Sequence, residues 1–200
     1  MTSDQNLDEQ YWDLRHQAGN TPWQLGVVSP PVAAYVDQLT NKDISILIPG
    51  AGHVHEAEYL LHHGFKDITI CDISKVAIES IKQKLGESSG VHYVHSDFFL
   101  IGGTFDLIIE QTFFCALDPT LRSDYVSTMY RLLRNGGKLV GLLFSSVFSH
   151  SGPPFGGDVY EYKLLFGKWL HIQTMEMCYN SIPPRQNNEL FFICQKLSNV

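Results

Sequence analysis

Ile48-Pro49-Gly50-Ala51-Gly52-His53 forms a glycine-containing turn, which follows an apolar run at 44–48 and precedes a helical pattern at 55–63. Glycines at such a turn let backbone amides approach a ligand closely at the start of a helix. A strand, a glycine turn and a helix in this order are typical of the first unit of an open α/β sheet that binds a nucleoside. Taken alone, Gly-x-Gly is equally consistent with an ordinary tight turn.

The alternation of strand and helix patterns continues along the chain. These segments are apolar strand patterns at 67–71, 91–94, 105–109 and 138–144, and helical patterns at 74–85 and 121–133. Strands joined through helices indicate parallel βαβ units, and strands apolar on both faces indicate a sheet covered on both sides. Two more strands, at 171–179 and 189–196, are joined by a polar loop and predict a hairpin. We therefore expect an α/β fold: a mostly parallel, doubly wound sheet with a C-terminal antiparallel hairpin at one edge.

The size and charge of the chain narrow the class of protein. Its 200 residues suit a single domain, and 14 Lys and Arg against 21 Asp and Glu give a net charge of −7. An acidic chain without a Lys/Arg run lacks the positive field that nucleic-acid binding requires. No apolar run approaches the roughly 18 residues of a membrane span. We expect a protein that binds neither nucleic acid nor membrane.

The cysteines and histidines show no metal-binding pattern. None of the four cysteines are spaced as in zinc or redox motifs, and the nine histidines form no ligand set. The polar N-terminus has no signal-peptide pattern. These features predict a cytoplasmic protein with reduced thiols and no metal site, and we expect a monomer.

Acidic and polar residues follow several of the predicted strands. Asp72 comes 20 residues after Gly52, the spacing at which a carboxylate can accept hydrogen bonds from both ribose hydroxyls of a nucleoside. Asp97-Phe98 could contact an adenine amino group and cover its ring, and Gln111 ends the fourth strand. Each carboxylate could instead begin a helix or a loop. Because ligands of open α/β sheets bind outside the carboxyl ends of the strands, we expect these residues to share one crevice.

The nature of the nucleoside follows from what the glycine turn lacks. A dinucleotide fingerprint needs a third glycine three positions beyond Gly52, where this chain has His55. A shorter Gly-x-Gly turn suits a ligand that carries an amino-acid tail in place of a pyrophosphate. Together with the C-terminal hairpin, this favours S-adenosylmethionine (SAM) over a nicotinamide cofactor.

Six segments, in order over about residues 11–196, resemble the thiopurine methyltransferase family of class I SAM-dependent methyltransferases, which also includes plant-type halide and thiol methyltransferases. The segments are Tyr11-Trp12-Asp13 with Arg15, Thr21-Pro22-Trp23-Gln24-Leu25-Gly26, Pro49-Gly50-Ala51-Gly52, Asp72-Ile73-Ser74, Thr112-Phe113-Phe114-Cys115-Ala116-Leu117-Asp118-Pro119 and Gly152-Pro153-Pro154-Phe155. The Thr-Pro-Trp and Thr-Phe-Phe-Cys-Ala-Leu-Asp-Pro stretches are the specific ones.

This resemblance implies a Rossmann-like methyltransferase domain over residues 1–200, with an N-terminal helical lid at 1–40 on a core at 41–200. The residues expected to bind the cofactor SAM are Trp12, Trp23, Gly50, Gly52, Asp72, Ile73, Asp97, Phe98 and Gln111. A Trp face attracts a sulfonium cation with roughly 1–2 kcal/mol when the pair is desolvated. Either Trp could instead pack beneath the N-terminal segment.

The sequence departs from the family pattern at several positions. Ala51 stands where the family usually has Cys, Val54 where a glycine is frequent, and Gln24 where Asp is frequent. His16 replaces a Trp of some plant members, and Gln111 replaces a frequent aromatic residue. The changes at Val54 and His16 concern cofactor binding, whereas Gln24 bears on the choice of substrate.

The expected substrate is a small soft nucleophile: a thiol, a thiopurine, a halide or thiocyanate. Transfer of a methyl cation to such an anion is favoured in a dry, weakly polar pocket and needs no strong base. The resemblance places Phe114, Arg122 and Phe155 around this acceptor, with Arg122 facing an anion or a thiol proton. Arg122 could instead be an exposed residue at a helix start. A SAM-binding module without activity and, less favoured, a nicotinamide-dependent oxidoreductase remain as alternatives.

Overall fold

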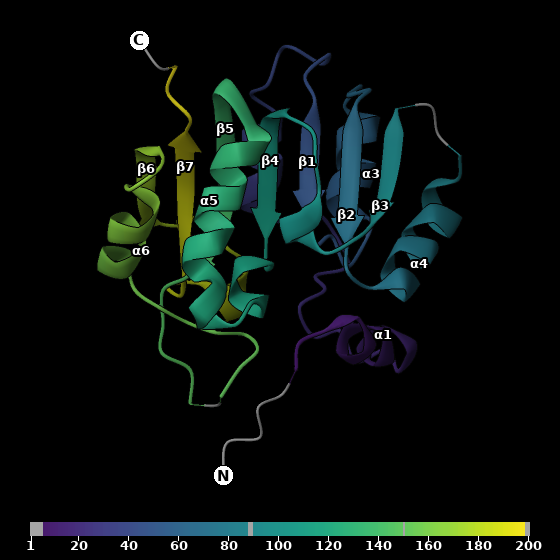
Figure 1. Cartoon of the computed structure of the whole chain (residues 1–200), viewed down its shortest axis with the longest axis horizontal. Coiled ribbons are helices and arrows are strands. Elements are labelled where there is room, and N and C mark those ends of the chain that lie inside the picture. The colour runs from purple at the N-terminus through teal and green to yellow at the C-terminus, as the bar shows by residue number, and fades with distance from the viewer. Residues whose placement is uncertain (1–5, 88–89, 150, 199–200) are drawn as a thin grey trace.

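A computed structural model describes residues 6–87, 90–149 and 151–198 of the chain, which form one seven-stranded sheet with helices on both faces (Figure 1). The strands are β1 (Ile46–Pro49), β2 (Ile68–Asp72), β3 (Val91–His95), β4 (Phe105–Gln111), β5 (Leu133–Phe144), β6 (His171–Met177) and β7 (Glu189–Gln195). The helices are α1 (Glu9–Gln17), α2 (Pro30–Val36), α3 (His55–His62), α4 (Lys75–Leu85), α5 (Arg122–Leu132) and α6 (Val159–Phe166). Single 3-10 turns are η1 (Phe98–Leu100), η2 (Phe114–Ala116), η3 (Pro119–Leu121) and η4 (Pro183–Arg185).

The strand order is β3-β2-β1-β4-β5-β7-β6, and β1 to β5 are parallel. The chain order reverses between β1 and β4, so a crevice opens beyond the carboxyl ends of these two strands. The N-terminal helix α1 lies beyond the same ends, below the arrow tips of β1 to β3 in Figure 1. The sheet therefore brings the glycine turn, the ends of β2 and β4 and the N-terminal segment to one edge.

The C-terminal hairpin is confirmed, with one refinement. Strand β7 pairs antiparallel with both β5 and β6. Because two antiparallel steps restore the original direction, the edge strand β6 runs the same way as β5. Among the described strands, β7 alone therefore opposes the others.

Two hydrophobic layers enclose the sheet. Helices α2, α3 and α4 cover one face, where Val36, Leu60 and Ile81 pack against the strands, and α5 and α6 cover the other, through Met129 and Phe166. The strands in the middle of the sheet are buried on both faces, as their continuous apolar sequences predict.

The local signals of the sequence place most element ends. Ser74 caps α4 by accepting a hydrogen bond from the amide of Ala77 at 3.1 Å, and Gly86 ends the helix with φ of +70°. The strand expected from Lys138 instead begins at Leu133, directly after α5. Phe105 pairs with Leu133 across a register shift, so the glycine-rich stretch before Lys138 belongs to the strand and does not form a separate loop.

Candidate functional site

The glycine turn after β1 is held by Asp72 at the end of β2. One carboxylate oxygen of Asp72 accepts a hydrogen bond from the amide of Gly52 at 2.8 Å, and the other accepts from the amide of Ser74 at 2.8 Å. Asp72 is 7% exposed, and this burial raises its pKa while the two amide donors oppose the rise. A carboxylate offers about four acceptor positions, so two remain for a ligand. The contact with the ribose hydroxyls that the sequence predicts and the alternative role of Asp72 at a helix start are therefore compatible.

An aromatic ring lies directly on the first glycine of the turn. Gly50 has φ of +55°, and a Cβ added there would be 2.1 Å from Cδ2 of Phe113. The Phe113 ring also meets Phe98 edge-on, with the ring centroids 5.1 Å apart. Phe113 therefore fills the space between Gly50 and Phe98, two residues that the sequence assigns to the cofactor.

The turn after β4 has a strained backbone that a buried carboxylate supports. Thr112 has φ of +59°, a left-handed conformation that β-branched residues rarely adopt. Glu110 accepts hydrogen bonds from the amides of Phe113 and Phe114 at 2.8 and 3.1 Å. Both polar side-chain atoms of Gln111 are buried without a hydrogen-bond partner among the described residues. The turn thus presents an unsatisfied amide group to the crevice, which is consistent with a polar ligand.

The state of Glu110 leads to a stability prediction. Burial raises its pKa to about 7 from an ordinary value near 4.5. Between these two pH values the unfolded chain loses the proton and the folded chain keeps it, so stability falls as the pH rises. We expect Glu110 to lower the free energy of unfolding by roughly 3 kcal/mol as the pH rises from 4.5 to 8. Glu110→Gln, which retains an oxygen acceptor for the two amides, should remove this loss.

Chemical denaturation of both proteins at pH 5 and pH 8 measures the effect. The difference in unfolding free energy between Glu110→Gln and the wild type should shift in favour of the variant at the higher pH. Glu87→Gln is the matched control, because the Glu87 side chain is 84% exposed and should show no such shift. Equal pH dependence of Glu110→Gln and the wild type would contradict the expectation.

The N-terminal helix α1 is fastened to the core beside Asp72. Asp13 accepts hydrogen bonds from the hydroxyl of Ser74 at 2.6 Å and from the amide of Val76 at 3.1 Å. Glu9 lies 3.0 Å from the imidazole of His95. Helix α1 thereby completes the N-terminal cap of α4.

Trp23 joins α1 to the glycine turn. Its indole nitrogen lies 3.2 Å from the position of a Cβ on Gly52, whose amide is bonded to Asp72. The ring of Trp12 meets the Trp23 ring edge-on, with the ring centroids 5.6 Å apart. The guanidinium of Arg15 lies 5.0 Å from the centroid of the Trp23 ring. The indole of Trp23 is thus already in contact with a cation. Trp23 and Asp72, which the sequence assigns to one crevice, meet through Gly52.

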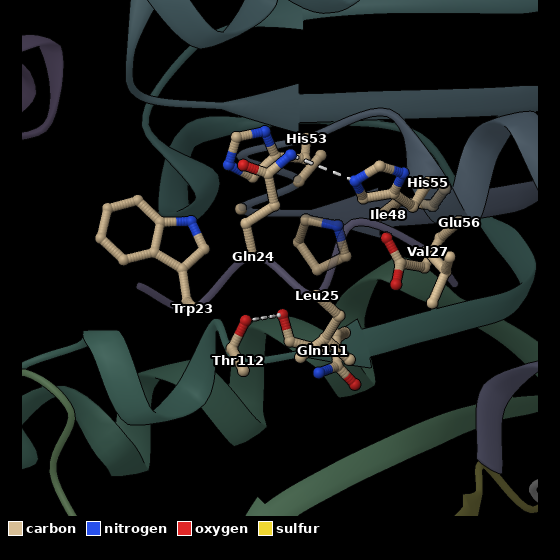
Figure 2. Close-up of a pocket in the computed structure, with 13 residues that line it drawn as sticks. Trp23, Gln24, Leu25, Val27, Ile48, His53, His55, Glu56, Gln111 and Thr112 are labelled. Atoms are coloured by element: carbon tan, nitrogen blue, oxygen red, sulfur yellow. Dashed lines mark hydrogen bonds between the residues drawn. The ribbon is translucent and has the colours of Figure 1, made fainter. Parts of the chain in front are cut away.

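Figure 2 shows the pocket next to this junction. Trp23 stands at one end, His53 and His55 at one side, and Gln111 with Thr112 opposite them. The side chain of Gln24 reaches His55 at 3.2 Å (Figure 2). The residues lining the pocket are Trp23, Gln24, Leu25, Val27, Ile48, Pro49, Gly50, Ala51, His53, His55, Glu56, Gln111 and Thr112. The cavity measures about 30 Å³.

Two groups in this pocket, the half-buried His53 and the buried Glu56, have shifted pKa values. Burial, assisted by the neighbouring His16 and His55, lowers the pKa of His53 to about 4. Burial raises the pKa of Glu56 to about 7. Near neutral pH the imidazole is therefore uncharged. Among the described residues, no group of three His, Cys, Asp or Glu side chains is placed to hold a metal ion.

The remaining expected cofactor residues lie at the ends of β2 and β3. Asp97 accepts a hydrogen bond from the amide of Phe99 at 3.0 Å and thereby caps η1. Phe98 is buried beneath Phe113. The carbonyl of Ile73 lies 3.1 Å from the imidazole of His95. The ends of β1 to β4 and the N-terminal segment therefore carry all nine expected cofactor residues.

Known proteins that are similar to this chain identify its family. The family model described as Thiopurine S-methyltransferase (TPMT) matches residues 7–194. The chain belongs to the thiopurine S-methyltransferase family. It is therefore an enzyme of the SAM-dependent methyltransferases, and the family and the cofactor expected from the sequence are confirmed.

Similar proteins bear names from the same family. The chain is 32% identical over 157 residues to a probable thiol methyltransferase 2 of Arabidopsis thaliana, covering 76% of this chain and 69% of that protein. It is 25% identical over 196 residues to a thiopurine S-methyltransferase of Acinetobacter baylyi, covering 85% and 88%.

Solved structures confirm the fold. The 1,6-didemethyltoxoflavin-N1-methyltransferase of Burkholderia thailandensis superposes with a TM-score of 0.76 at 17% identity, covering 95% of this chain and 87% of that one. The N-methyltransferase NodS of Bradyrhizobium japonicum, in complex with S-adenosylhomocysteine, superposes with a TM-score of 0.70 at 20% identity, covering 97% and 100%. The expected Rossmann-like methyltransferase fold is therefore correct.

The three residues that the family pattern places around the acceptor lie on the α5–α6 side of the sheet. Phe114 is 1% exposed and packs against Tyr125 in the core. Arg122 is 7% exposed and donates hydrogen bonds to Glu161 and to the carbonyl of Gly156, both at 2.6 Å. The alternative of an exposed arginine at a helix start is therefore wrong. In this structure Arg122 connects the start of α5 to α6 and to the loop before it, Phe114 packs in the core beside them, and the contact of either residue with an acceptor stays a prediction.

Phe155 lies in the loop before α6. Its amide donates a hydrogen bond to the carbonyl of Cys115 at 2.7 Å, which ties that loop to the turn after β4. Phe155 is half-buried, so part of its ring remains accessible. Of the three residues expected at the acceptor, Phe155 is therefore the one whose side chain is not fully buried, and it lies beside the turn after β4.

The sequence did not indicate several residues that shape the site. Asp13 and Arg15 lie within a motif of the thiopurine methyltransferase family, yet only the structure shows that one caps α4 and the other stacks on Trp23. No sequence pattern indicated Arg185, because it contacts Trp23 from a loop 162 residues away in the chain.

In the part of the chain that the structure describes, no helix is long and apolar enough to cross a membrane.

Proposed function

We propose that this protein methylates a small, soft nucleophile, such as a thiol, a thiopurine, a halide or thiocyanate, with SAM as donor. The observation that supports this most directly is the junction of Trp23, Gly52 and Asp72, where an indole and a buried carboxylate meet on one glycine turn. The names of the similar proteins, thiol, thiocyanate and thiopurine methyltransferase, support the same substrate class.

The nine cofactor residues would divide the nucleoside between them. Asp72 would accept the ribose hydroxyls with its remaining lone pairs, and Asp97 with Phe98 would face the adenine. Gly50, Gly52 and Gln111 would meet the amino-acid tail, where the unpartnered amide of Gln111 can both donate and accept. Ile73 would lie beside the ribose, and Trp12 with Trp23 would cover the sulfonium.

The reaction asks for little acid–base chemistry from the protein. When bound, SAM supplies an electrophilic methyl group next to a positive sulfur. Attack by a thiolate or a halide joins a cation to an anion, so the charge disappears as the bond forms, and this is favoured where water is excluded. The rings of Trp12, Trp23 and Phe113 would exclude water and align the two reactants.

The size of the cavity implies a movement on binding. Ligand pockets usually measure about 300–1,000 Å³, roughly ten times the space beside Trp23 or more. The Phe113 ring fills the gap over Gly50, and an apolar ring is held there by packing alone. We propose that Phe113 swings away from Gly50 when the nucleoside enters.

Calorimetric titration with SAM, followed by a methyl-transfer assay, tests the function. The acceptors to compare are iodide, thiocyanate, hydrosulfide and an aromatic thiol, with detection of the methylated product. Binding together with product supports the proposal. Binding without product on any of these four acceptors would contradict the proposed substrate class, and absence of SAM binding would contradict the proposed site.

Trp23→Ala should weaken SAM binding at least tenfold, because the cofactor loses both the indole face and the shield from water. The measurement is the dissociation constant by calorimetry. Trp169→Ala is the matched control: Trp169 is half-exposed and packs against the ring of Tyr130 at an interplanar angle of 46°, away from the glycine turn. Equal affinities of Trp23→Ala and the wild type would rule out contact between the indole and the cofactor.

A further inference from the structure

Arg185 reaches the Trp23 loop from the opposite end of the chain. It ends the single turn η4 in the connection between β6 and β7. Its guanidinium donates a hydrogen bond to the backbone carbonyl of Trp23 at 2.9 Å. Trp23 itself lines the pocket, as do Gln24, Leu25 and Val27 directly after it. Arg185 is therefore hydrogen-bonded to the segment that forms one wall of the pocket.

The guanidinium is held in place by two further contacts. One nitrogen lies 3.2 Å from a carboxylate oxygen of Glu189, and the group lies 5.5 Å from the ring centroid of Phe144. The side chains of Arg185 and Glu189 are only 11% and 3% exposed. A planar guanidinium can serve a carboxylate, a carbonyl and an aromatic ring at once, whereas the ammonium of lysine is a point charge.

A buried ion pair of this kind is weak evidence for stability, because desolvation of the two charges offsets their attraction. The contribution of the ion pair to the site is the hydrogen bond that Arg185 donates to the carbonyl of Trp23. Glu189 and Phe144 fix the orientation of the guanidinium that makes this bond. A loop of turn-forming residues gains from this contact a defined position over the glycine turn. The indole of Trp23 then stands 3.2 Å from the Cβ position of Gly52.

We propose that Arg185 is a positioning residue for SAM binding: through the carbonyl of Trp23 it sets the indole over the glycine turn. This inference rests on the proposed binding of SAM at that turn. It assigns to the β6–β7 connection a role in a cofactor site whose other expected residues lie between Trp12 and Gln111. Arg185 itself is not among the residues that line the pocket beside Trp23.

Amide hydrogen exchange of the free protein tests, without any ligand, whether Arg185 holds the Trp23 loop in place. In Arg185→Lys, which keeps a positive charge beside Glu189, the amides at 21–29 should exchange about tenfold faster than in the wild type. Arg134→Lys is the matched control, since Arg134 pairs with Asp106 at the start of β4, away from the pocket. Unchanged exchange at 21–29 in Arg185→Lys would overturn the proposal.

A double-mutant cycle tests whether Arg185 acts through the indole. Arg185→Lys should weaken SAM binding about tenfold in the wild-type background and leave it unchanged in the Trp23→Ala background. Equal weakening in both backgrounds would overturn the proposal, because a general loss of structure does not depend on the indole. If the wild type fails to bind SAM, the proposed function fails, and the exchange experiment still decides the role of Arg185.

Discussion

Asp72→Ala is expected to weaken SAM binding at least a hundredfold and to lower the stability of the protein. The substitution removes the charged acceptor of the amides of Gly52 and Ser74, both at 2.8 Å. Hydrogen bonds to a charged group contribute about 1.5–3 kcal/mol each, so loss of the two lowers the free energy of unfolding by about 3–6 kcal/mol. The glycine turn then loses its anchor, and the proposed ribose contact disappears with it.

Thermal unfolding and calorimetry on the same samples separate the two effects. Asp118→Ala is the control, because Asp118 also accepts hydrogen bonds from a nearby amide and hydroxyl, both of Thr120, but lies on the surface. Asp118→Ala should lower the melting temperature slightly and leave the dissociation constant for SAM unchanged. If folded Asp72→Ala binds SAM as tightly as the wild type, Asp72 does not hold the ribose.

Gly50→Ala is expected to abolish SAM binding and to destabilise the fold by a few kcal/mol. The new methyl group would lie 2.1 Å from the Phe113 ring, so the ring and the turn after β4 must shift. Overpacking of this kind costs about 1–3 kcal/mol, and the left-handed backbone adds about 1–2 kcal/mol for a residue with a Cβ.

Gly64→Ala isolates the backbone contribution of this change. Gly64 has φ of +84°, and nothing lies within 4 Å of its Cβ position, so only the strain of the left-handed conformation remains. It should lower the melting temperature modestly and leave SAM binding intact. Similar affinities of the two variants would show that contact between Gly50 and Phe113 does not control the crevice.

Much of the fold could be read from local patterns. The cap at Ser74, the stop at Gly86 and the apolar strands depend on neighbours in the chain, and each is found where the sequence indicates. The start of β5 differs from its local pattern because the pairing of Leu133 with Phe105 is a long-range event that overrides the turn preference of a glycine pair. The direction of β6 likewise depends on where β7 inserts, which no local pattern encodes.

The candidate site divides in the same way. Gly52 and Asp72 could be expected together, because strand ends in a parallel sheet meet at one edge. The burial of Arg122 could not, since it depends on Glu161 in a later helix and on a loop carbonyl. The contact between Arg185 and Trp23 belongs to the same class: a side chain meets a backbone atom, and the identity of the partner residue carries no signal.

The attachment of α1 through Asp13 couples the docking of this helix to the proposed binding of the donor. Asp13 accepts a hydrogen bond from the Ser74 hydroxyl, and the Ser74 amide donates one to Asp72, so helix docking and the carboxylate proposed to hold the ribose share one short stretch of backbone. Thermodynamic linkage then requires reciprocity: a nucleoside that favours one arrangement of this stretch tightens the docking of α1, and a docked α1 tightens the nucleoside by the same factor. Binding of the donor and docking of α1 would therefore stabilise each other, whichever of the two occurs first.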